Sequence, residues 1–464
     1  MNNNHILIDS QEQVIVAQCT SQGAGAIALL RLSGKDVFKL VDYAARLASG
    51  KKLADQNTHT IHFGWVIDQQ GQPIDQVLFL VMKGPKTFTG QDVIEITCHN
   101  NQFLIEKIID RMMASGARLA GKGEFTQRAV ALGKIDLLQA EAIHDLINAQ
   151  TASSVEYSLK QLEGSLSSWM FEVETAVLEI MAFCEGSFEF LDEEMEFGAD
   201  VAIKIDRLLE KIQNLLRTFP KQQYIKEGIK IVLVGSVNAG KSSLFNCLLE
   251  KNRAIVTPIA GTTRDTIEAG VYREGEFLTF IDTAGIRKTD DDIELAGIDR
   301  SFQEAVGADI ILLVIDCSQQ ISSDTLAAYE KIIKNYSDKI ILVYNKIEEQ
   351  SVSDSLSFDG PSIGVSAKNH KNIDILYHEI FNKIKDLKGS EAITCLLNKR
   401  QYDLLTKFYR NLHEIRSMLN VKRIDYELVS YNLKEALSLM SELTGRSISE
   451  AAFDKVFDTF CVGK

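Results

Sequence analysis

The segment Gly235-Ser-Val-Asn-Ala-Gly-Lys-Ser242 decides how the central part of the chain folds. It matches the pattern GxxxxGK followed by Ser or Thr, in which glycines let several backbone N–H groups point at the same phosphates. An apolar run precedes it at residues 231–234 and a helix-compatible stretch follows at residues 243–250, so the phosphates would lie at a helix N-terminus. This context predicts a nucleotide site in which Lys241 neutralises the β- and γ-phosphates and Ser242 binds Mg²⁺.

Four apolar runs follow this segment, and each ends in a loop with polar residues. They occupy residues 278–282, 310–316, 340–345 and 363–366. In an open parallel sheet, ligands bind at the carboxyl ends of the strands, so we expect these loops to converge on one crevice. The pattern predicts a Ras-like P-loop domain with an α/β fold.

Short motifs in these loops have the order and spacing of a GTPase. Asp282-Thr-Ala-Gly285 supplies a carboxylate for Mg²⁺ and a glycine N–H for a γ-phosphate, and Gly261-Thr-Thr-Arg-Asp265 supplies the Thr263 hydroxyl for Mg²⁺. Asn345-Lys-Ile-Glu348 and Ser366-Ala-Lys368 stand where a GTPase places its guanine-reading loops. The predicted GTP-binding residues are Asn238, Ala239, Gly240, Lys241, Ser242, Ser243, Thr257, Pro258, Ile259, Ala260, Gly261, Thr262, Thr263, Asp282, Thr283, Ala284, Gly285, Asn345, Lys346, Glu348, Ser366, Ala367 and Lys368.

Two positions indicate how this site would activate water. Ile286 stands where Ras-type enzymes have a Gln that orients the attacking water. Asn238 lies inside the P-loop, where its side-chain oxygen can join phosphate oxygens around a monovalent cation. Such a cation would place positive charge where other GTPases use an arginine finger. We therefore expect a monovalent cation to take part in hydrolysis.

The composition limits the class of protein. A chain of 464 residues suggests about two to four domains, and its formal charge of −14 argues against a general electrostatic attachment to nucleic acid. Neither a signal peptide nor a run of about eighteen apolar residues is evident, which predicts a cytoplasmic protein with no membrane partner. The seven cysteines form no CxxC pair and no cluster with histidine, so we expect neither a disulfide framework nor structural zinc.

The segments around the nucleotide domain differ in periodicity. Residues 14–134 contain short strand-like runs and a helical run at 103–113, which predicts mixed α/β structure. Apolar residues from Val155 to Ile180 step by three and four and predict one long amphipathic helix. Further helical runs occupy residues 202–217, 402–419 and 426–443. The simplest architecture is a helical domain into which the nucleotide domain is inserted.

Over nearly its whole length the chain resembles one family, the tRNA modification GTPases called MnmE or TrmE. The resemblance rests on Val14-Ile-Val-Ala-Gln18, Leu30-Arg-Leu-Ser-Gly34, Phe88-Thr-Gly90, Gly123-Glu-Phe-Thr126, residues 133–142, residues 238–244, residues 259–265, residues 294–298 and Phe460-Cys-Val-Gly-Lys464. The family implies a multidomain fold, α/β plus all-α. Its parts would be an N-terminal α/β folate-binding and dimerisation domain at residues 1–130, a discontinuous helical domain at 131–222 and 388–464, and an inserted Ras-like G domain at 223–387.

The same resemblance implies an activity, cofactors and partners. Members hydrolyse GTP with Mg²⁺, and K⁺-dependent dimerisation of their G domains switches hydrolysis on. They form a homodimer through the N-terminal domain and a heterotetramer with MnmG, so FAD is bound only by that partner. Together the two proteins add an aminomethyl or carboxymethylaminomethyl group to the wobble uridine of certain tRNAs. The one-carbon donor would be 5,10-methylene- or 5-formyl-tetrahydrofolate.

The resemblance also implies roles for individual residues. The expected K⁺ ligands are Asn238, Thr257, Ile259 and Thr262, and the expected folate-binding residues are Arg31, Glu95, Lys134 and Lys464. Glu294 would order the attacking water and act in catalysis with Asn238, and Cys461 would lie near the one-carbon unit as a catalytic thiol. From the residues alone, Arg31 and Glu95 are expected to be either a paired structural charge or outward-facing residues within strands. By the same reasoning Cys461 is an exposed tail thiol.

The chain departs from the family at several positions. Glu348 replaces the Asp that ends the family's guanine motif, and its longer side chain is expected to reach guanine less well. Thr20-Ser-Gln-Gly-Ala-Gly-Ala26 stands at the family's glycine-rich segment, and His99-Asn-Asn101 at a His-Gly-Gly. The folate domain is still expected despite these changes, but the details of its binding pocket stay open.

Two alternatives share some of these features. A ribosome-assembly type of RNA-binding regulatory GTPase has the same nucleotide motifs, usually with a compact basic domain. Here only residues 399–423 are locally basic, and they suit a tRNA or partner contact or a solvated helix face. A folate-dependent transferase with a vestigial G domain is the other alternative, and the complete set of phosphate and magnesium residues argues against it.

Overall fold

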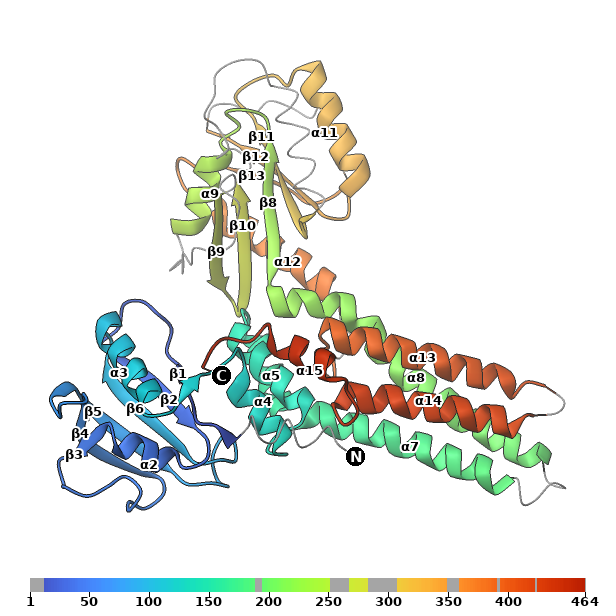
Figure 1. The fold of residues 1–464 in the computed structure, drawn as a ribbon. Helices are drawn as coiled ribbons and strands as arrows, with labels where there is room; N and C mark the ends of the chain where they lie inside the picture. Colours follow the sequence, from blue (N-terminus) through green and yellow to red (C-terminus); the bar gives the residue numbers. More distant parts are fainter. Residues whose placement is uncertain are drawn as a thin grey trace. The chain divides into compact units, whose positions relative to one another are not determined.

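The structure is a computed structural model that describes residues 12–187, 194–250, 267–282, 307–348, 359–389, 393–421 and 424–463 (Figure 1). The chain divides into two compact units. The terminal unit comprises residues 1–144, 160–209 and 403–464, and the nucleotide unit comprises residues 145–159 and 210–402. The four segment boundaries given above stay a prediction.

A seven-stranded sheet with strand order β3-β4-β5-β6-β2-β1-β7 forms the first part of the terminal unit. Its strands are β1 (Ile15–Gln18), β2 (Ile27–Ser33), β3 (Ala45–Leu47), β4 (Thr60–Ile67), β5 (Pro73–Met82), β6 (Val93–His99) and β7 (Arg118–Leu119). Neighbouring strands are antiparallel except β1 and β7, which are parallel. The mixed α/β structure predicted for this region is confirmed, including the helical run at 103–113, which is α3 (Gln102–Ala114).

The two faces of this sheet differ because side chains alternate along each strand. Residues such as Leu30 and Ile96 form the inner face, where they pack with residues of α2 (Val37–Asp42) and α3. The intervening residues of β1, β2, β5 and β6 form the outer face. There α4 (Glu124–Ala131) covers the β1 end, because Phe125 packs on Ile15 and Ala17. Arg31 and Glu95 lie on this outer face, opposite each other in the register of β2 and β6.

Helices make up the remainder of the terminal unit. They are most of α5 (Leu137–Asn148), α7 (Ser165–Ser187), the first part of α8 (Glu194–Glu227), most of α13 (Lys399–Met418), α14 (Tyr426–Thr444) and α15 (Glu450–Phe457). Figure 1 shows α7, α8, α13 and α14 side by side. The ion pair Arg416–Asp206 joins α13 to α8 at 2.8 Å, and Lys204–Glu179 joins α8 to α7 at 3.1 Å. Among the described residues, none of the helices has the length and apolar content needed to cross a bilayer.

The single long helix predicted from Val155 to Ile180 is wrong. The chain forms α6 (Ala152–Leu162) and then α7, with Gly164 between them at φ 96°. Glycine enters this left-handed region without steric cost, so the helix stops while the apolar stripe continues on the next one. The run at 202–217 lies in the longer α8, and the predicted helices at 402–419 and 426–443 are confirmed as α13 and α14.

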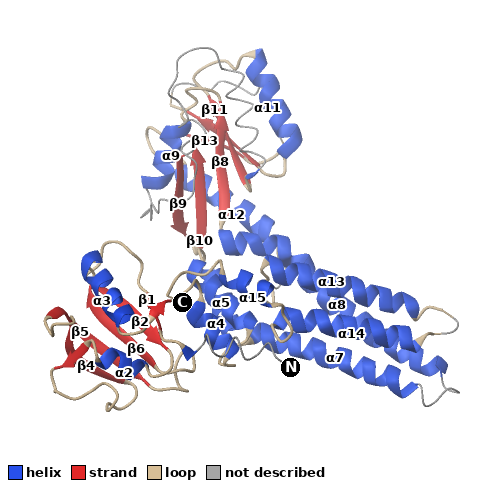
Figure 2. Cartoon of the chain, in the orientation of Figure 1, coloured by secondary structure: helices blue, strands red, loops and turns tan. Residues whose placement is uncertain are grey.

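The nucleotide unit is built on a six-stranded sheet with strand order β13-β12-β11-β8-β10-β9 (Figure 2). Its strands are β8 (Ile229–Gly235), β9 (Ile267–Arg273), β10 (Glu276–Asp282), β11 (Ile310–Asp316), β12 (Ile340–Asn345) and β13 (Ser362–Val365). The predicted parallel strands are confirmed, and β9 is an additional antiparallel edge strand that the sequence did not predict. Helices α9 (Lys241–Glu250) and α12 (Ile373–Lys388) cover one face, and α11 (Ser323–Tyr336) covers the other.

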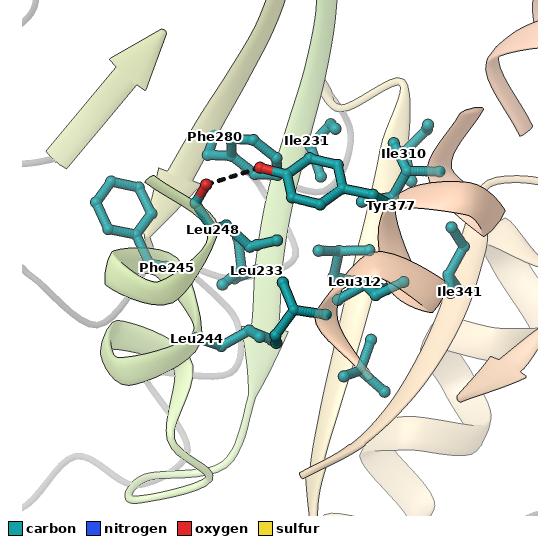
Figure 3. Packing of buried hydrophobic residues seen from close by; sticks show 14 of the residues in the cluster. Ile231, Leu233, Leu244, Phe245, Leu248, Phe280, Ile310, Leu312, Ile341 and Tyr377 are labelled. Atoms are coloured by element: carbon teal, nitrogen blue, oxygen red, sulfur yellow. Dashed lines mark hydrogen bonds between the residues drawn. The ribbon is translucent and has the colours of Figure 1, made fainter. Parts of the chain in front are cut away.

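One buried hydrogen bond links the two helices on the first face (Figure 3). Tyr377 of α12 is 1% exposed, and its hydroxyl donates to the carbonyl of Leu248 in α9 at 2.7 Å. The ring also meets Phe280 edge to face, with ring centroids 6.4 Å apart. Since α9 begins at the phosphate loop, this bond fixes the far end of the helix that carries Lys241.

We predict that Tyr377→Phe lowers the free energy of unfolding of the nucleotide unit by about 0.5–1.5 kcal/mol, because the ring is kept while one buried hydrogen bond is lost. Urea denaturation followed by circular dichroism measures the change. The matched control is Tyr272→Phe, since Tyr272 is 42% exposed and should tolerate the change. Equal stability of Tyr377→Phe and the unmodified chain would contradict this role.

Candidate nucleotide site and N-terminal polar site

The phosphate loop connects β8 to α9 and has two residues with positive φ, Asn238 at 66° and Gly240 at 88°. A Cβ atom on Gly240 would lie 2.2 Å from the amide nitrogen of Asn345, so only glycine fits there. The two positive φ values let the loop curl at the N-terminus of α9. Any side chain at position 240 would force the loop backbone or Asn345 to move.

Lys241 and Ser242 begin α9 at the end of this loop. The Lys241 side chain is 7% exposed, and its ammonium donates to the carbonyl oxygens of Gly235 at 2.8 Å and Ser236 at 2.7 Å. Ser242 is exposed in the first turn of α9. The Lys241 ammonium and the exposed Ser242 in the first turn of α9 thus lie where a phosphate and its metal ion would bind.

The Asn345 side chain joins the phosphate loop to both predicted guanine loops. Its amide nitrogen donates to the Ala239 carbonyl at 2.9 Å, and its oxygen accepts from the Ala367 N–H at 3.1 Å. Three segments that are far apart in the sequence, at residues 235–242, 345–348 and 366–368, therefore meet at the carboxyl ends of β8, β12 and β13. This convergence is the one expected for a parallel sheet.

Two residues of this site were not assigned a role from the sequence. Asp316 at the end of β11 accepts a hydrogen bond from the Lys346 ammonium at 2.7 Å, and Tyr329 of α11 accepts one from the Ser236 N–H at 2.7 Å. Burial alone would raise the pKa of Asp316, but hydrogen bonds from Lys346 and Ser318 hold it below its usual value. The position of Asp316 at a strand end is the signal that could have identified it.

Glu348 is exposed and its carboxylate reaches the second guanine loop. A hydrogen bond with the Ser366 side chain is the main reason that the pKa of Glu348 lies below its usual value. Ser366 is buried, and its hydroxyl oxygen accepts from the Asn369 N–H at 3.1 Å. The Ser366 hydroxyl thus favours the charged form of the longer side chain at the start of the loop at 366–368.

Several predicted site residues lie outside the described part of the chain. They are the loop residues Thr257, Pro258, Ile259, Ala260, Gly261, Thr262 and Thr263, the motif residues Thr283, Ala284 and Gly285, and Glu294 and Lys464. Asp282, which precedes the second group, is described at the end of β10 and is 2% exposed. The remaining predicted nucleotide residues belong to the three converging segments or to the first turn of α9.

Arg31 and Glu95 form an ion pair of 2.8 Å on the outer face of the terminal sheet. Their side chains are 20% and 15% exposed. The Arg31 guanidinium also lies over the rings of Phe88 and Phe125, at 5.4 and 5.7 Å from the ring centroids. The pairing inferred from the strand pattern is therefore present, and aromatic rings from two other segments surround it.

Lys134 lies against the same loop that carries Phe88. Its ammonium donates to the Pro85 carbonyl at 2.8 Å, and a Cβ atom on Gly90 would lie 3.1 Å from its side chain. Residues 85–90 therefore connect Lys134 to Arg31. Cys461 is exposed, and its carbonyl accepts from the Gly123 N–H at 3.2 Å just before α4.

A buried charge network that the sequence did not identify supports this region. Arg128 of α4 is 1% exposed, pairs with Glu124 at 2.9 Å, and donates to the side chain of Gln91 at 3.1 Å and the carbonyl of Ser33 at 3.4 Å. It thereby ties α4 to the end of β2 and to the segment after Phe88. An arginine within an amphipathic helix gives no sequence sign of burial, which explains why it was missed.

The departures from the family at residues 99–101 have local structural roles. Asn101 caps α3, because its side chain accepts from the N–H groups of Phe103 at 3.0 Å and Leu104 at 3.3 Å. The Asn100 amide donates to the carbonyls of Gly23 at 2.8 Å and Gly25 at 3.2 Å. The asparagines thus fix the start of the helix and the segment at 20–26, which is the other departure.

Two family models match consecutive parts of the chain. The model described as "GTP-binding protein TrmE N-terminus" matches residues 14–134, and the model described as "MnmE helical domain" matches residues 137–461. Together they span both units.

The chain is also similar to three proteins named "tRNA modification GTPase MnmE". The protein of Aquifex aeolicus is 37% identical over 453 residues, which are 97% of this chain and 99% of that protein. The protein of Thermotoga maritima is 36% identical over 458 residues, with the same shares of the two chains. The protein of Geobacillus kaustophilus is 37% identical over 469 aligned positions, again 97% and 99% of the chains. The chain therefore belongs to the MnmE (TrmE) family of tRNA modification GTPases.

Proposed function

We propose that this chain is a K⁺-activated GTPase that works with the FAD-dependent partner MnmG on the wobble uridine of tRNA. The reaction adds an aminomethyl or carboxymethylaminomethyl group, with 5,10-methylene- or 5-formyl-tetrahydrofolate as the one-carbon donor. The observation that carries the GTPase part is the Asn345 side chain, which joins the phosphate loop to the guanine loops. The name of the relatives, tRNA modification GTPase, supports the tRNA part.

The nucleotide residues fit GTP and Mg²⁺ chemically. Lys241 and the N-terminus of α9 would bind the phosphates, and the exposed Ser242 hydroxyl with the Asp282 carboxylate would hold Mg²⁺ directly or through water. Mg²⁺ supplies charge that stabilises the leaving phosphate oxygens. Glu348 and the loop at 366–368 would bind guanine, and Thr263 would complete the metal site.

The same loop supports a role for K⁺. Asn238 is exposed and has positive φ in the phosphate loop, and its amide oxygen would be one K⁺ ligand there. Thr257, Ile259 and Thr262 would supply the other K⁺ ligands, and Glu294 would orient the attacking water. K⁺ adds positive charge near the phosphates. Dimerisation of the G domains would bring these groups together.

The outer face of the terminal sheet supports folate binding. A folate has an aromatic pterin with hydrogen-bonding edges and a glutamate tail, and this region offers the Arg31–Glu95 pair, the Phe88 ring and the Lys134 ammonium. Glu95 would accept hydrogen bonds from the pterin, while Lys134 and Lys464 would bind carboxylate groups. Cys461 would act near the one-carbon unit.

The same face supports the homodimer. Ile61 and Phe63 of β4 and Leu78 of β5 are exposed, and the register places Phe63 opposite Leu78. Adjacent exposed apolar side chains on one sheet face are typical of a protein interface. A second copy covering β4 and β5 would give the homodimer, on which MnmG would assemble as a heterotetramer.

The proposed function is tested by mass spectrometry of wobble nucleosides in cells that lack this protein. We expect the aminomethyl and carboxymethylaminomethyl uridines to disappear and to return when the unmodified chain is supplied. A chain with Lys241→Ala should fail to restore them, because phosphate binding is lost. Unchanged nucleosides in the deletion strain would overturn the proposal.

We predict that GTP hydrolysis is on the order of 10²-fold faster in KCl than in NaCl at equal ionic strength, because one preorganised charge interaction has about that effect on catalysis. Phosphate release measures the rate. Asn238→Ala should abolish the difference between the two salts, whereas Val237→Ala, a change at the neighbouring exposed residue, should retain it. Equal rates of the unmodified chain in both salts would exclude the K⁺ mechanism.

We predict that Glu348→Asp tightens GDP binding by about two- to tenfold, because the shorter side chain has one torsion fewer to immobilise. Isothermal titration at neutral pH, where both residues are carboxylates, gives the dissociation constant. Glu330→Asp on the exposed side of α11 is the matched control. Unchanged or weaker binding would show that Ser366 already holds Glu348 in the required position.

A further inference from the structure

The segment after α15 returns to the start of the terminal unit. Val462 forms an antiparallel bridge with Lys122, and the Gly123 N–H donates to the Cys461 carbonyl at 3.2 Å. Phe460 is buried, with its ring centroid 5.0 Å from that of Phe457. We refer to residues 458–463 as the tail. Phe460 anchors the tail, and three described residues follow it.

The last of these residues, Gly463, lies against the end of β1. The thiol of Cys19 donates to the Gly463 carbonyl at 3.1 Å. Gly463 has φ 97°, and a Cβ atom on it would lie 2.3 Å from the carbonyl oxygen of Gln18. Only glycine permits so close an approach of two backbones. The hydrogen bond from Cys19 and the close backbone contact with Gln18 thus both involve Gly463.

The register of the sheet places this contact on the face that holds the polar site. Ala17 is opposite Arg31 in the pairing of β1 and β2, and the ladder continues because the Cys19 N–H donates to the Leu29 carbonyl at 2.8 Å. Side chains two residues apart on a strand share a face, so Cys19 lies on the same face as Ala17 and Arg31. A tail that accepts a hydrogen bond from the Cys19 thiol therefore lies over that face.

We propose that Cys19 is a positioning residue: its thiol and the glycine-only contact at Gly463 latch the tail onto β1 and so fix where Cys461 is presented. Buried Phe460 precedes Cys461, and the Gly123 N–H binds the Cys461 carbonyl itself. The bridge at Val462 and the latch at Gly463 hold the chain after it. Its exposed thiol is then held two residues before the contact of the tail with the sheet face that carries Arg31 and Glu95. A role for the positioned Cys461 in tRNA modification rests on the proposed function. The contact between Cys19 and Gly463 does not depend on that function.

The latch is tested by hydrogen exchange of the full chain, read by mass spectrometry on peptides covering residues 118–124 and 458–464. Cys19→Ala removes the donor, and we expect exchange in both peptides to become about three- to tenfold faster. Cys19→Ser keeps a donor on a shorter bond and should restore part of the protection. GTP hydrolysis should be unchanged in both variants. Equal exchange in Cys19→Ala and the unmodified chain overturns the latch.

The glycine contact has its own test. Gly463→Ala should release the tail and speed alkylation of Cys19 by iodoacetamide at least tenfold, measured on the peptide that contains Cys19. Gly71→Ala is the matched control, because Gly71 also has positive φ, 78°, but no atom lies within 4 Å of the position of its Cβ. Unchanged Cys19 alkylation in Gly463→Ala overturns the docking of the tail on β1.

A third measurement separates the latch from the proposed function. Cys19→Ala should lower tRNA modification by extracts of complemented cells about three- to tenfold, and Cys19→Ser should recover part of it. If Cys19→Ala makes hydrogen exchange of the tail faster but leaves tRNA modification unchanged, the latch is supported. The same result would overturn the idea that the latch positions Cys461 for the reaction. Slower modification with unchanged exchange would overturn the latch as the cause.

Discussion

The nucleotide site depends on one side-chain amide, that of Asn345. An amide both donates and accepts, and here it satisfies the Ala239 carbonyl on one side and the Ala367 N–H on the other. Both contacts are buried, so losing the side chain would leave two backbone groups without this partner at a cost of about 1–3 kcal/mol each. The position of the phosphate loop relative to the guanine loops is thereby fixed before a ligand binds. The same amide nitrogen lies too close to Gly240 for a side chain to fit there. The Asn345 side chain therefore constrains both Ala239 and Gly240 of the phosphate loop.

The polar site of the terminal unit is built on a different principle. The nucleotide site uses the ends of parallel strands, whereas Arg31 and Glu95 project from the middle of an antiparallel sheet. A sheet face is flat, so the surroundings must come from other segments: Phe88 from a loop and Phe125 from α4. Arg128 of α4 connects these two segments through its hydrogen bond to Gln91, and its bond to the Ser33 carbonyl connects α4 to β2. Buried arginines are costly unless fully paired, and this one has partners on three segments.

The sequence predicts the parts of the structure that repeat a local rule. The glycine loop before α9, the parallel strands and the helix at α3 follow from motif and periodicity. The break at Gly164 was missed because the apolar stripe runs through it, and β9 was missed because an edge strand needs no long apolar run. Partners such as Asp316 and Arg128 depend on which distant segments meet, and periodicity carries no such information. The departures at Asn100 and Asn101 supply loop contacts and a helix cap, respectively.

The contact between Cys19 and Gly463 also sets the order in which the protein can be completed. These residues are 444 positions apart, and the whole nucleotide unit lies between them. At a synthesis rate of about 5–20 residues per second, the tail is made roughly 20 to 90 seconds after Cys19, and after all strands of the N-terminal sheet. Its strands can pair early, because most of the hairpins are local. The face that carries Arg31 stays without the tail until the end of synthesis. Cys461 therefore reaches its place only after the nucleotide unit has been made.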